Sequence, residues 1–466
     1  MMNAIVLLLA TLPVLPAVRS ERISDAKLPA EGYRIRIDAG GKATIEAADA
    51  AGRFYAEKTL AQLPRPLVPG EIEDWPAFSW RGVHLDESRH FFGKNAVKRI
   101  LDRMADYKLN VFHWHLMDNT GNRFPLKRYP KMKTVGATRL APDVSRWMID
   151  DEFGVYGPFG YTVEDLAEIN AYAKARHIKI IPEVEIPGHA REVLMAYPEL
   201  FCGSKYDFGQ AIAFLSEGEA AKWSPSVVCL GNPRTIEFFE GVLEEVCELF
   251  PESEVIHIGG DECPRTNWVQ CARCQAKLKE IGSDDPAQLQ NWCTRHFADY
   301  LARKGRKAIG WDEIIEGGIV DGALVMSWRG PEGGRAAAAA GHAAVMCPHT
   351  LCYFDYPQGL GEIDKCRYPR WNNVPVLTLE KVYGFDPCEG IPEDQRKFVL
   401  GGQANNWTEC TVTEKELQWK LWPRAIAMAE VLWTGPGARP YFDFARRLRP
   451  AVERLRGEGV NAAPVP

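Results

Sequence analysis

Long runs of apolar residues recur along the chain from Trp80 onward, and each is followed by a helical pattern or a polar loop. Within these runs the apolar positions are continuous rather than alternating, which is typical of parallel strands covered on both faces of a sheet. We expect eight such strands, at residues 82–86, 110–116, 178–185, 254–260, 307–311, 323–328, 343–347 and 398–403.

Helical patterns lie between these strands, at residues 94–107, 162–176, 234–249, 286–304 and 414–431. The second opens with Thr-Val-Glu-Asp, a capping-box pattern that marks the start of a helix. Eight strand and helix units in alternation predict an α/β fold, a (β/α)₈ TIM barrel, with the extra length in loops. A doubly wound open sheet is the structural alternative.

A smaller α/β module precedes the barrel. Residues 32–63 predict a strand, a Gly-Gly turn, a second strand and a helix, and the proline-rich segment 64–70 predicts a linker. The apolar run near the N-terminus is too short and too interrupted by proline to span a bilayer, so we interpret residues 1–20 as a signal peptide. The expected domains are therefore the signal peptide, a module at 21–75 and a barrel at 76–466.

Composition and charge narrow the class of protein. The formal net charge is −6 with no basic block, which argues against nucleic acid as a partner. No later segment has 18 uninterrupted apolar residues, so we expect no membrane span. Together with the predicted signal peptide, this predicts an exported protein, secreted or periplasmic. The 14 Trp, 15 Tyr and 20 Phe are mostly core residues, but some can line a carbohydrate site.

The 12 cysteines are even in number, which in an exported protein favours disulfides. Cys271 and Cys274 form a single C-x-x-C pair. Because no second such pair exists in the sequence, we expect no metal site.

Polar and aromatic residues follow every predicted strand. Chemistry in such barrels takes place at the carboxyl ends of the strands, so these residues predict one site. They are Asp86, Arg89, His115, Asp118, Glu183, Glu185, His189, Asp261, Glu262, Trp311, Asp312, Trp328, Arg329, Tyr353, Asp355, Trp407 and Glu409.

Two of these acids are adjacent, in the stretch ESEVIHIGGDECPR at residues 252–265. Asp261 and Glu262 could simply be a helix cap and a first-turn acid before Pro264. Among tryptophans and histidines, however, two carboxylates at a strand end suit glycosidic bond cleavage, which needs a proton donor and a group that stabilises positive charge. Unequal environments would keep one acid protonated and the other ionised.

Several motifs together resemble a known family. They are RGVHLDESRH, FHWHLMD, PEVEIPGHA, HIGGDE, IGWDE, VMSWRG and GGQANNWTE, and they occur in this order between Trp80 and Trp433. This pattern resembles the β-N-acetylhexosaminidases of glycoside hydrolase family 20.

The resemblance implies a role for each matching residue. Glu262 would be the general acid and base, and Asp261 would hold the 2-acetamido group of the substrate, whose carbonyl oxygen attacks the anomeric carbon. Asp118 and His189 would tune the proton affinity of Glu262. The remaining implied substrate contacts are Arg89, Asp355 and Glu409 to the sugar hydroxyls, Tyr353 to the acetamide oxygen, and Trp311, Trp328 and Trp407 as pocket walls. No cofactor is implied.

The chain departs from the family pattern after the second strand, where Asn119, Thr120 and Asn122 replace an acid, a glutamine and an aromatic residue. Glu185 also stands where the family has aspartate. The altered loop would face the leaving group, so the preference for the aglycone is open. The N-terminal module is also shorter than the domain the family commonly carries.

The expected function is that of an exported exo-β-N-acetylhexosaminidase. It would release terminal β-linked GlcNAc or GalNAc from an oligosaccharide or glycoconjugate, with retention and through an oxazoline. A disaccharide-releasing relative and a glycan-binding protein on an inactive barrel are the alternatives. Metal-dependent hydrolysis is disfavoured, because the histidines lack the spacing of an H-E-x-x-H motif.

Overall fold

The computed structural model of the chain describes residues 28–141, 148–151, 153–217, 222–359, 374–437 and 440–466. The predicted signal peptide, residues 1–20, lies outside these ranges and stays a prediction. Among the described helices, none combines the length and apolar character needed to cross a membrane.

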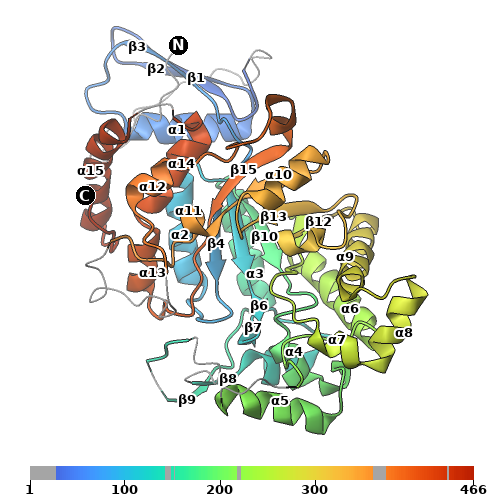
Figure 1. The fold of residues 1–466 in the computed structure, drawn as a ribbon. Helices are drawn as coiled ribbons and strands as arrows, with labels where there is room; N and C mark the ends of the chain where they lie inside the picture. Colours follow the sequence, from blue (N-terminus) through green and yellow to red (C-terminus); the bar gives the residue numbers. More distant parts are fainter. Residues whose placement is uncertain (1–27, 142–147, 152, 218–221, 360–373, 438–439) are drawn as a thin grey trace.

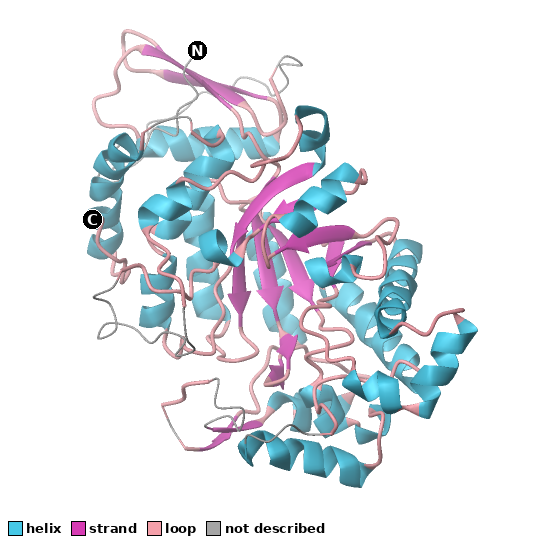
Figure 2. Ribbon diagram, in the orientation of Figure 1, coloured by secondary structure: helices cyan, strands magenta, loops and turns pink. Residues whose placement is uncertain are grey.

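Eight parallel strands close into a barrel in the order β10-β11-β12-β13-β14-β15-β4-β5 (Figures 1 and 2). Each coincides with one of the predicted apolar runs, so the TIM barrel is confirmed and the open-sheet alternative is wrong. The strands are β4 (Trp80–Asp86), β5 (Val111–His115), β10 (Lys179–Glu183), β11 (Val255–His257), β12 (Lys307–Trp311), β13 (Leu324–Ser327), β14 (Ala344–Met346) and β15 (Val399–Ala404).

Both faces of this sheet are covered, which explains the continuous apolar runs. Every residue of β4 and β5 is buried. Helices cover the outside of the strands in Figure 2. The described α-helices after the N-terminal module are α2 (Lys94–Asp106), α3 (Val163–Lys174), α4 (Arg191–Ala196), α5 (Lys205–Glu217), α6 (Pro233–Leu249), α7 (Thr266–Gln270), α8 (Ala272–Glu280), α9 (Pro286–Arg303), α10 (Glu332–Ala339), α11 (His349–Cys352), α12 (Leu379–Tyr383), α13 (Glu414–Leu421), α14 (Arg424–Thr434) and α15 (Tyr441–Gly457).

The helix starts follow local sequence. Thr162 and Asp165 form the predicted capping box of α3, with side chain and backbone bonded in both directions. The single helix predicted at 414–431 is wrong, because α13 ends at Leu421 and α14 begins at Arg424. Pro423 lies between them. Its ring and missing N–H prevent a continuous helix, and Trp422 before it is extended, as a residue before proline prefers.

The N-terminal module is a three-stranded antiparallel sheet with one helix. Strands β1 (Tyr33–Ile37), β2 (Ala43–Ala47) and β3 (Gly70–Asp74) pair in the order β2-β1-β3, and α1 (Ala50–Gln62) covers them. The third strand was not predicted, and it begins inside the expected linker. Trp433 of α14 lies in the module's core, with its ring centroid 5.3 Å from that of Tyr55. The module therefore shares its core with the barrel.

The carboxyl ends of the barrel strands point toward the lower part of Figure 1. Short strands β6 (Met117–Asp118) and β7 (Gly121–Asn122) lie there, with α4, α5 and α7 beyond them. A second hairpin of β8 (Arg139–Ala141) and β9 (Gly154–Tyr156) lies on the same side. The N-terminal module is at the opposite end, so it takes no part in a site at the carboxyl ends.

Ten cysteines in the described residues, Cys410 set aside, are free thiols. The disulfide prediction is therefore wrong for these ten, and Cys366 lies outside the described residues. The C-x-x-C pair has two further cysteines as neighbours, Cys202 and Cys229. Their separation along the chain hid this group from the sequence analysis.

Candidate active site

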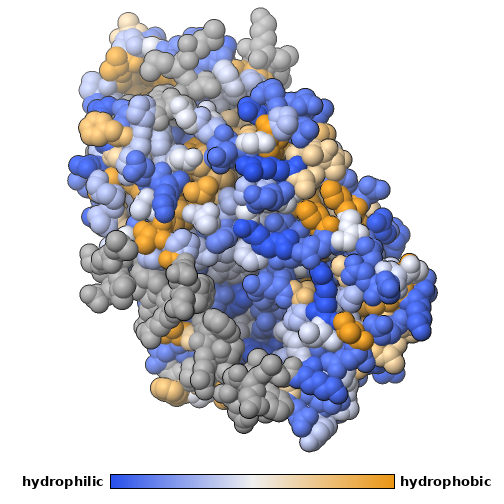
Figure 3. Space-filling model, in the orientation of Figure 1, coloured by the Kyte–Doolittle hydropathy of each residue, from blue (hydrophilic) through white to orange (hydrophobic). Residues whose placement is uncertain are grey.

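A cavity of about 680 Å³ opens at the carboxyl ends of the strands. In Figure 3 hydrophilic side chains gather across the centre and lower half of the face shown. Of the residues to which the family resemblance gives a role, all except Trp311 line this cavity. The other strand-end residues predicted for the site, Asp86, His115, Glu183, Glu185, Asp312 and Arg329, do not line it. The full lining is Arg89, Asp118, Asn119, Thr120, Met148, His189, Arg191, Ser224, Pro225, Ser226, Asp261, Glu262, Trp328, Tyr353, Asp355, Tyr356, Trp407 and Glu409.

The two adjacent acids are presented by an unusual backbone after β11. Glu262 has φ 45°, in the left-handed region that non-glycine residues rarely adopt, and His189 has the same value. Such strained positions persist at functional sites where the surroundings hold them. The turn directs both Asp261 and Glu262 into the cavity, although Asp261 is buried and the side chain of Glu262 is 62% exposed.

Close packing beside this turn requires glycine at position 259, in the HIGGDE stretch. A Cβ at this position would lie 2.0 Å from Oε2 of Glu185, and its φ is +63°. Glu185 is fully buried, and neither of its carboxyl oxygens has a hydrogen-bond partner in the described structure. Burial raises the pKa of Glu185 well above its usual value, which favours the neutral carboxyl.

His189 lies between two acids, Asp118 and Glu262. His189 places Nδ1 3.2 Å from Oδ1 of Asp118 and Nε2 3.5 Å from Oε2 of Glu262. The same Nε2 lies 3.5 Å from Oδ2 of Asp261. Burial alone would lower the pKa of His189, but Asp118 and Asp261 raise it well above 6.5, which favours the protonated ring. His189 thus contacts both adjacent acids.

A second histidine, His115, also contacts Asp118. His115 Nε2 lies 2.9 Å from Oδ2 of Asp118, and its Nδ1 bonds to Glu183. Burial opposes protonation of His115, but Glu183 and Asp118 raise its pKa to about 10. Glu183 also accepts from Trp311 Nε1 at 2.8 Å and contacts His257 Nδ1 at 2.8 Å. This buried network fixes Asp118 and, through it, His189.

The two adjacent acids differ in proton affinity. As the expected general acid, Glu262 should hold the proton, but the pKa shifts have the opposite order. Burial raises the pKa of Asp261 to about 7, although His189 opposes the shift. The hydrogen bond from His189 lowers the pKa of Glu262 below its usual value. The proton therefore favours Asp261 over Glu262.

Two buried carboxyl oxygens in the cavity have no hydrogen-bond partner in the described structure. They are Oδ1 of Asp261 and Oδ1 of Asp355. Burial also raises the pKa of Asp355 to about 7. A buried acceptor without a donor is costly, so both atoms are suited to receive a donor from a bound molecule.

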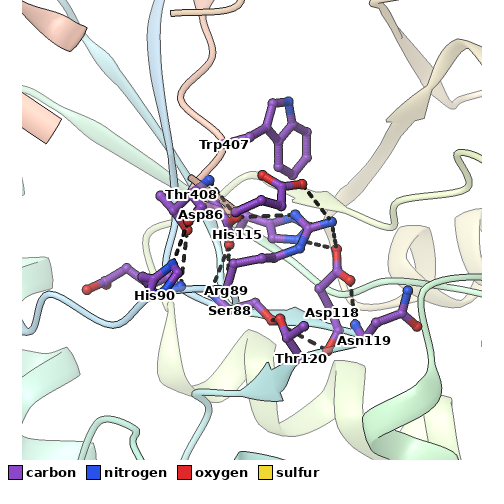
Figure 4. A network of polar contacts seen from close by, with 12 residues as sticks. Asp86, Ser88, Arg89, His90, His115, Asp118, Asn119, Thr120, Trp407 and Thr408 are labelled. Atoms are coloured by element: carbon purple, nitrogen blue, oxygen red, sulfur yellow. Dashed lines mark hydrogen bonds and ion pairs between the residues drawn. The ribbon is translucent and has the colours of Figure 1, made fainter. Parts of the chain in front are cut away.

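Arg89 is one of two arginines that line the cavity, and acidic side chains surround it (Figure 4). Its guanidinium lies 2.9 Å from Asp118, 3.2 Å from Asp86 and 3.5 Å from Glu409. It also lies 5.1 Å from the ring centroid of Trp407. These contacts fix the guanidinium plane and raise the pKa of Arg89 against the effect of burial, so its charge is permanent.

Aromatic rings form one wall. Trp328 and Tyr353 stack with their ring centroids 6.0 Å apart, and Trp407 is 6.1 Å from Tyr353. Trp328 donates to Oε2 of Glu313 at 2.9 Å. Trp311 does not line the cavity, because its indole points inward and donates to Glu183. Its position at the end of a strand was therefore misleading.

The altered loop after β5 only partly faces the cavity. Asn119 and Thr120 line it, and Asn119 Nδ2 lies 3.2 Å from His189 Nδ1. Asn122 is buried elsewhere and donates to the backbone of Phe124 and Met132. The expectation that all three departures face the leaving group is thus wrong for Asn122.

Other lining residues were not among the sequence predictions. They are Met148, Arg191, Ser224, Pro225, Ser226 and Tyr356. Most come from long connections without a periodic pattern, so no sequence signal distinguished them. Tyr356 follows the predicted Tyr353 and Asp355 on one loop, and that proximity could have included it.

Comparison with known proteins gives consistent matches along the chain. The model for the catalytic domain of glycosyl hydrolase family 20 matches residues 78–436, and that for domain 2 of the same family matches residues 5–75. The second match begins within the segment predicted as a signal peptide. A β-hexosaminidase of Porphyromonas gingivalis is 38% identical over an alignment of 454 residues, and the match covers 94% of this chain. The chain spans only 55% of that relative's length.

Two further proteins match over more of their own length. A β-hexosaminidase of Akkermansia muciniphila is 32% identical and is matched over 91% of this chain and 84% of its own. The structure of an exo-β-N-acetylglucosaminidase from Vibrio harveyi, in complex with N-acetylglucosamine, superposes with a TM-score of 0.83. That match has 30% sequence identity and covers 95% of this chain and 69% of the other.

Proposed function

The chain belongs to glycosyl hydrolase family 20, and from this we propose that it acts as an exo-β-N-acetylhexosaminidase with substrate-assisted catalysis. It would remove a terminal non-reducing GlcNAc or GalNAc from an oligosaccharide or glycoconjugate. We base this on the adjacent acids Asp261 and Glu262, which enter one cavity with His189 between them.

Asp261 would bind the acetamide group. Its buried Oδ1 has no donor in the described structure, and the N–H of a 2-acetamido group would supply one. Acceptance of this hydrogen bond favours the ionised carboxylate, so the pKa of Asp261 would fall from about 7 on binding. The carboxylate would then stabilise positive charge as the acetamide oxygen bonds to the anomeric carbon.

Glu262 would supply the proton for the leaving group. Its side chain is 62% exposed, and a bound sugar would cover it and raise its pKa. Because His189 Nε2 lies 3.5 Å from both acids, a proton on Asp261 could pass to Glu262 through His189 when substrate binds. The pair would titrate as one coupled unit.

The reaction would proceed in two balanced steps. First, the acetamide oxygen bonds to the anomeric carbon as the glycosidic bond breaks, and Glu262 gives its proton to the departing oxygen. Then water bonds to the same carbon, loses a proton to Glu262, and the oxazoline ring opens. Two displacements at one carbon retain the β configuration.

The remaining lining residues would hold the sugar. Arg89, with Glu409 and Asp355 nearby, offers donors and acceptors for hydroxyl groups. The wall of Trp328, Tyr353 and Trp407 would pack against the acetamide methyl group and the C–H face of the ring. The Vibrio harveyi relative, which is bound to N-acetylglucosamine, supports a sugar of this kind.

The exo mode is tested by comparing two 4-nitrophenyl substrates. One carries β-GlcNAc alone, and the other carries a disaccharide whose GlcNAc is capped by a β-galactose, a sugar without the 2-acetamido group that the proposed reaction needs. We expect nitrophenol only from the monosaccharide, because Arg89 and its acidic neighbours close the cavity around the outer hydroxyls. 4-Nitrophenyl β-glucoside is the matched control and should not react. Release from the disaccharide alone would instead favour the disaccharide-releasing alternative.

A further inference from the structure

Four cysteines from three separate segments meet beside α7 and α8. Cys202 follows the short helix η3 (Pro198–Leu200), Cys229 precedes α6, and Cys271 and Cys274 lie at the start of α8. Their sulfur atoms all lie within 4.8 Å of one another. The four residues are between 0% and 9% exposed, so the group is closed to solvent.

The distances between sulfur atoms distinguish a metal site from disulfides. The Sγ pairs Cys229–Cys274, Cys229–Cys271 and Cys202–Cys274 are 3.6, 3.7 and 3.8 Å apart. A disulfide would need about 2.05 Å. In a tetrahedral site with Zn–S bonds of about 2.3 Å, neighbouring sulfurs are about 3.8 Å apart. The thiols therefore already have the spacing of a tetrahedral thiolate site.

We propose that Cys202, Cys229, Cys271 and Cys274 bind one structural Zn²⁺ ion. Four soft thiolate ligands select zinc over the hard cations, which prefer oxygen. A site with four protein ligands is closed and leaves no position for water or substrate, so the role is structural. This inference does not depend on the proposed hydrolase activity.

The backbone around the cluster is shaped to bring its segments together. Gly231, two residues after Cys229, packs against the backbone of Arg273 and Cys274. A Cβ at Gly231 would lie 2.2 Å from the carbonyl carbon of Arg273 and 2.5 Å from the nitrogen of Cys274. Only glycine allows this approach, which places Cys229 against the C-x-x-C turn.

The cluster also has a nearby positive charge. Arg273 lies inside the C-x-x-C turn and donates through Nη2 to the carbonyl oxygens of Phe201 at 2.8 Å and Cys202 at 3.5 Å. A zinc ion with four thiolates carries two negative charges. The guanidinium would partly balance that charge, and it joins the Cys202 segment to the turn.

A metal here would stabilise one wall of the active-site cavity. Ser224 and Ser226 line the cavity a few residues before Cys229. Asn267 of α7 exchanges two hydrogen bonds of 2.7 Å with the backbone of Ser224. The same helix begins four residues after Glu262 and ends just before Cys271. Zinc would thus join the Ser224–Ser226 wall to the segment that carries the catalytic acids.

The test is the metal content of the full chain, purified without chelator and measured by inductively coupled plasma mass spectrometry. We expect about one zinc per chain. Cys202→Ser and Cys274→Ser should lose the zinc and unfold at a lower temperature. Cys388→Ser is the matched control, since Cys388 is 9% exposed, like Cys202, and lies outside the cluster. It should keep the metal.

A second measurement keeps the proposal testable if the variants fail to fold. Wild-type chain produced with Co²⁺ should show the intense visible absorption of a tetrahedral cobalt–thiolate centre. The proposal is overturned if wild-type chain contains no stoichiometric metal and shows no such absorption. It is also overturned if peptide mapping of the non-reduced chain finds disulfides among these four cysteines.

Discussion

Glu262→Gln should lower the hydrolysis of a substrate with a sugar leaving group by about 10²–10⁴-fold, the usual effect of a positioned general acid. The amide cannot donate an acidic proton to the departing oxygen. With a 2,4-dinitrophenyl leaving group, which departs without protonation, the loss in the first step should be much smaller. Steady-state kinetics with leaving groups of graded acidity measure this difference.

The fold should survive this substitution, because the Glu262 side chain is 62% exposed. Glu332→Gln is a suitable control, since its side chain is 78% exposed and lies outside the cavity lining. It should leave all rates unchanged. An equal loss for every leaving group would show that Glu262 is not the acid.

Asp261→Asn should reduce kcat/KM by about 10²–10³-fold, the scale expected when one preorganised electrostatic partner of the transition state is removed. Unlike the loss at Glu262, this loss should not recover with better leaving groups, because attack by the acetamide precedes or accompanies their departure. The substitution keeps the size of the side chain and removes only its charge.

A thiazoline analogue of the bicyclic intermediate provides a second readout for Asp261. The wild-type chain should bind it far more tightly than substrate, as expected for a mimic of a reaction intermediate. Asp261→Asn should lose most of this advantage while its thermal unfolding remains similar to wild type. If Asp261 were instead a covalent nucleophile, a 2-fluoro sugar would label it, and mass spectrometry would find the adduct.

The barrel could be predicted because its strands are buried on both sides. Burial on two faces leaves continuous apolar runs such as 110–116, which the sequence displays directly. The break at Pro423 was also visible, but the apolar period on both sides of it suggested one helix. Trp433 in the core of the N-terminal module had no sequence signal, since that contact joins residues far apart.

The site residues could be predicted where a reactive side chain comes soon after the end of a barrel strand. Asp261 and Glu262 belong to that class, and so does Arg89. Trp311 shows the limit of the rule, because a residue at the end of a strand can point into the barrel as well as into the cavity. The Ser224–Ser226 wall lies in a long connection, where only the folded structure determines what reaches the site.

The cysteine cluster was missed for a related reason. Its three segments are separated by tens of residues, with 26 residues between Cys202 and Cys229. A search for two C-x-x-C pairs cannot find this arrangement. The sequence also could not predict which of the two adjacent acids holds a proton more tightly. The pKa of Asp261, raised to about 7, depends on burial and on groups from other strands.

The most direct test of the account is the effect of fluorine in the substrate's own acetamide. Wild-type chain would be given 4-nitrophenyl β-glycosides whose N-acetyl methyl carries zero, one, two or three fluorine atoms. If the acetamide oxygen is the nucleophile positioned by Asp261, each fluorine weakens it, and kcat/KM should fall steeply along the series. Rates that stay level from the unfluorinated to the trifluorinated substrate would contradict substrate-assisted catalysis by this chain.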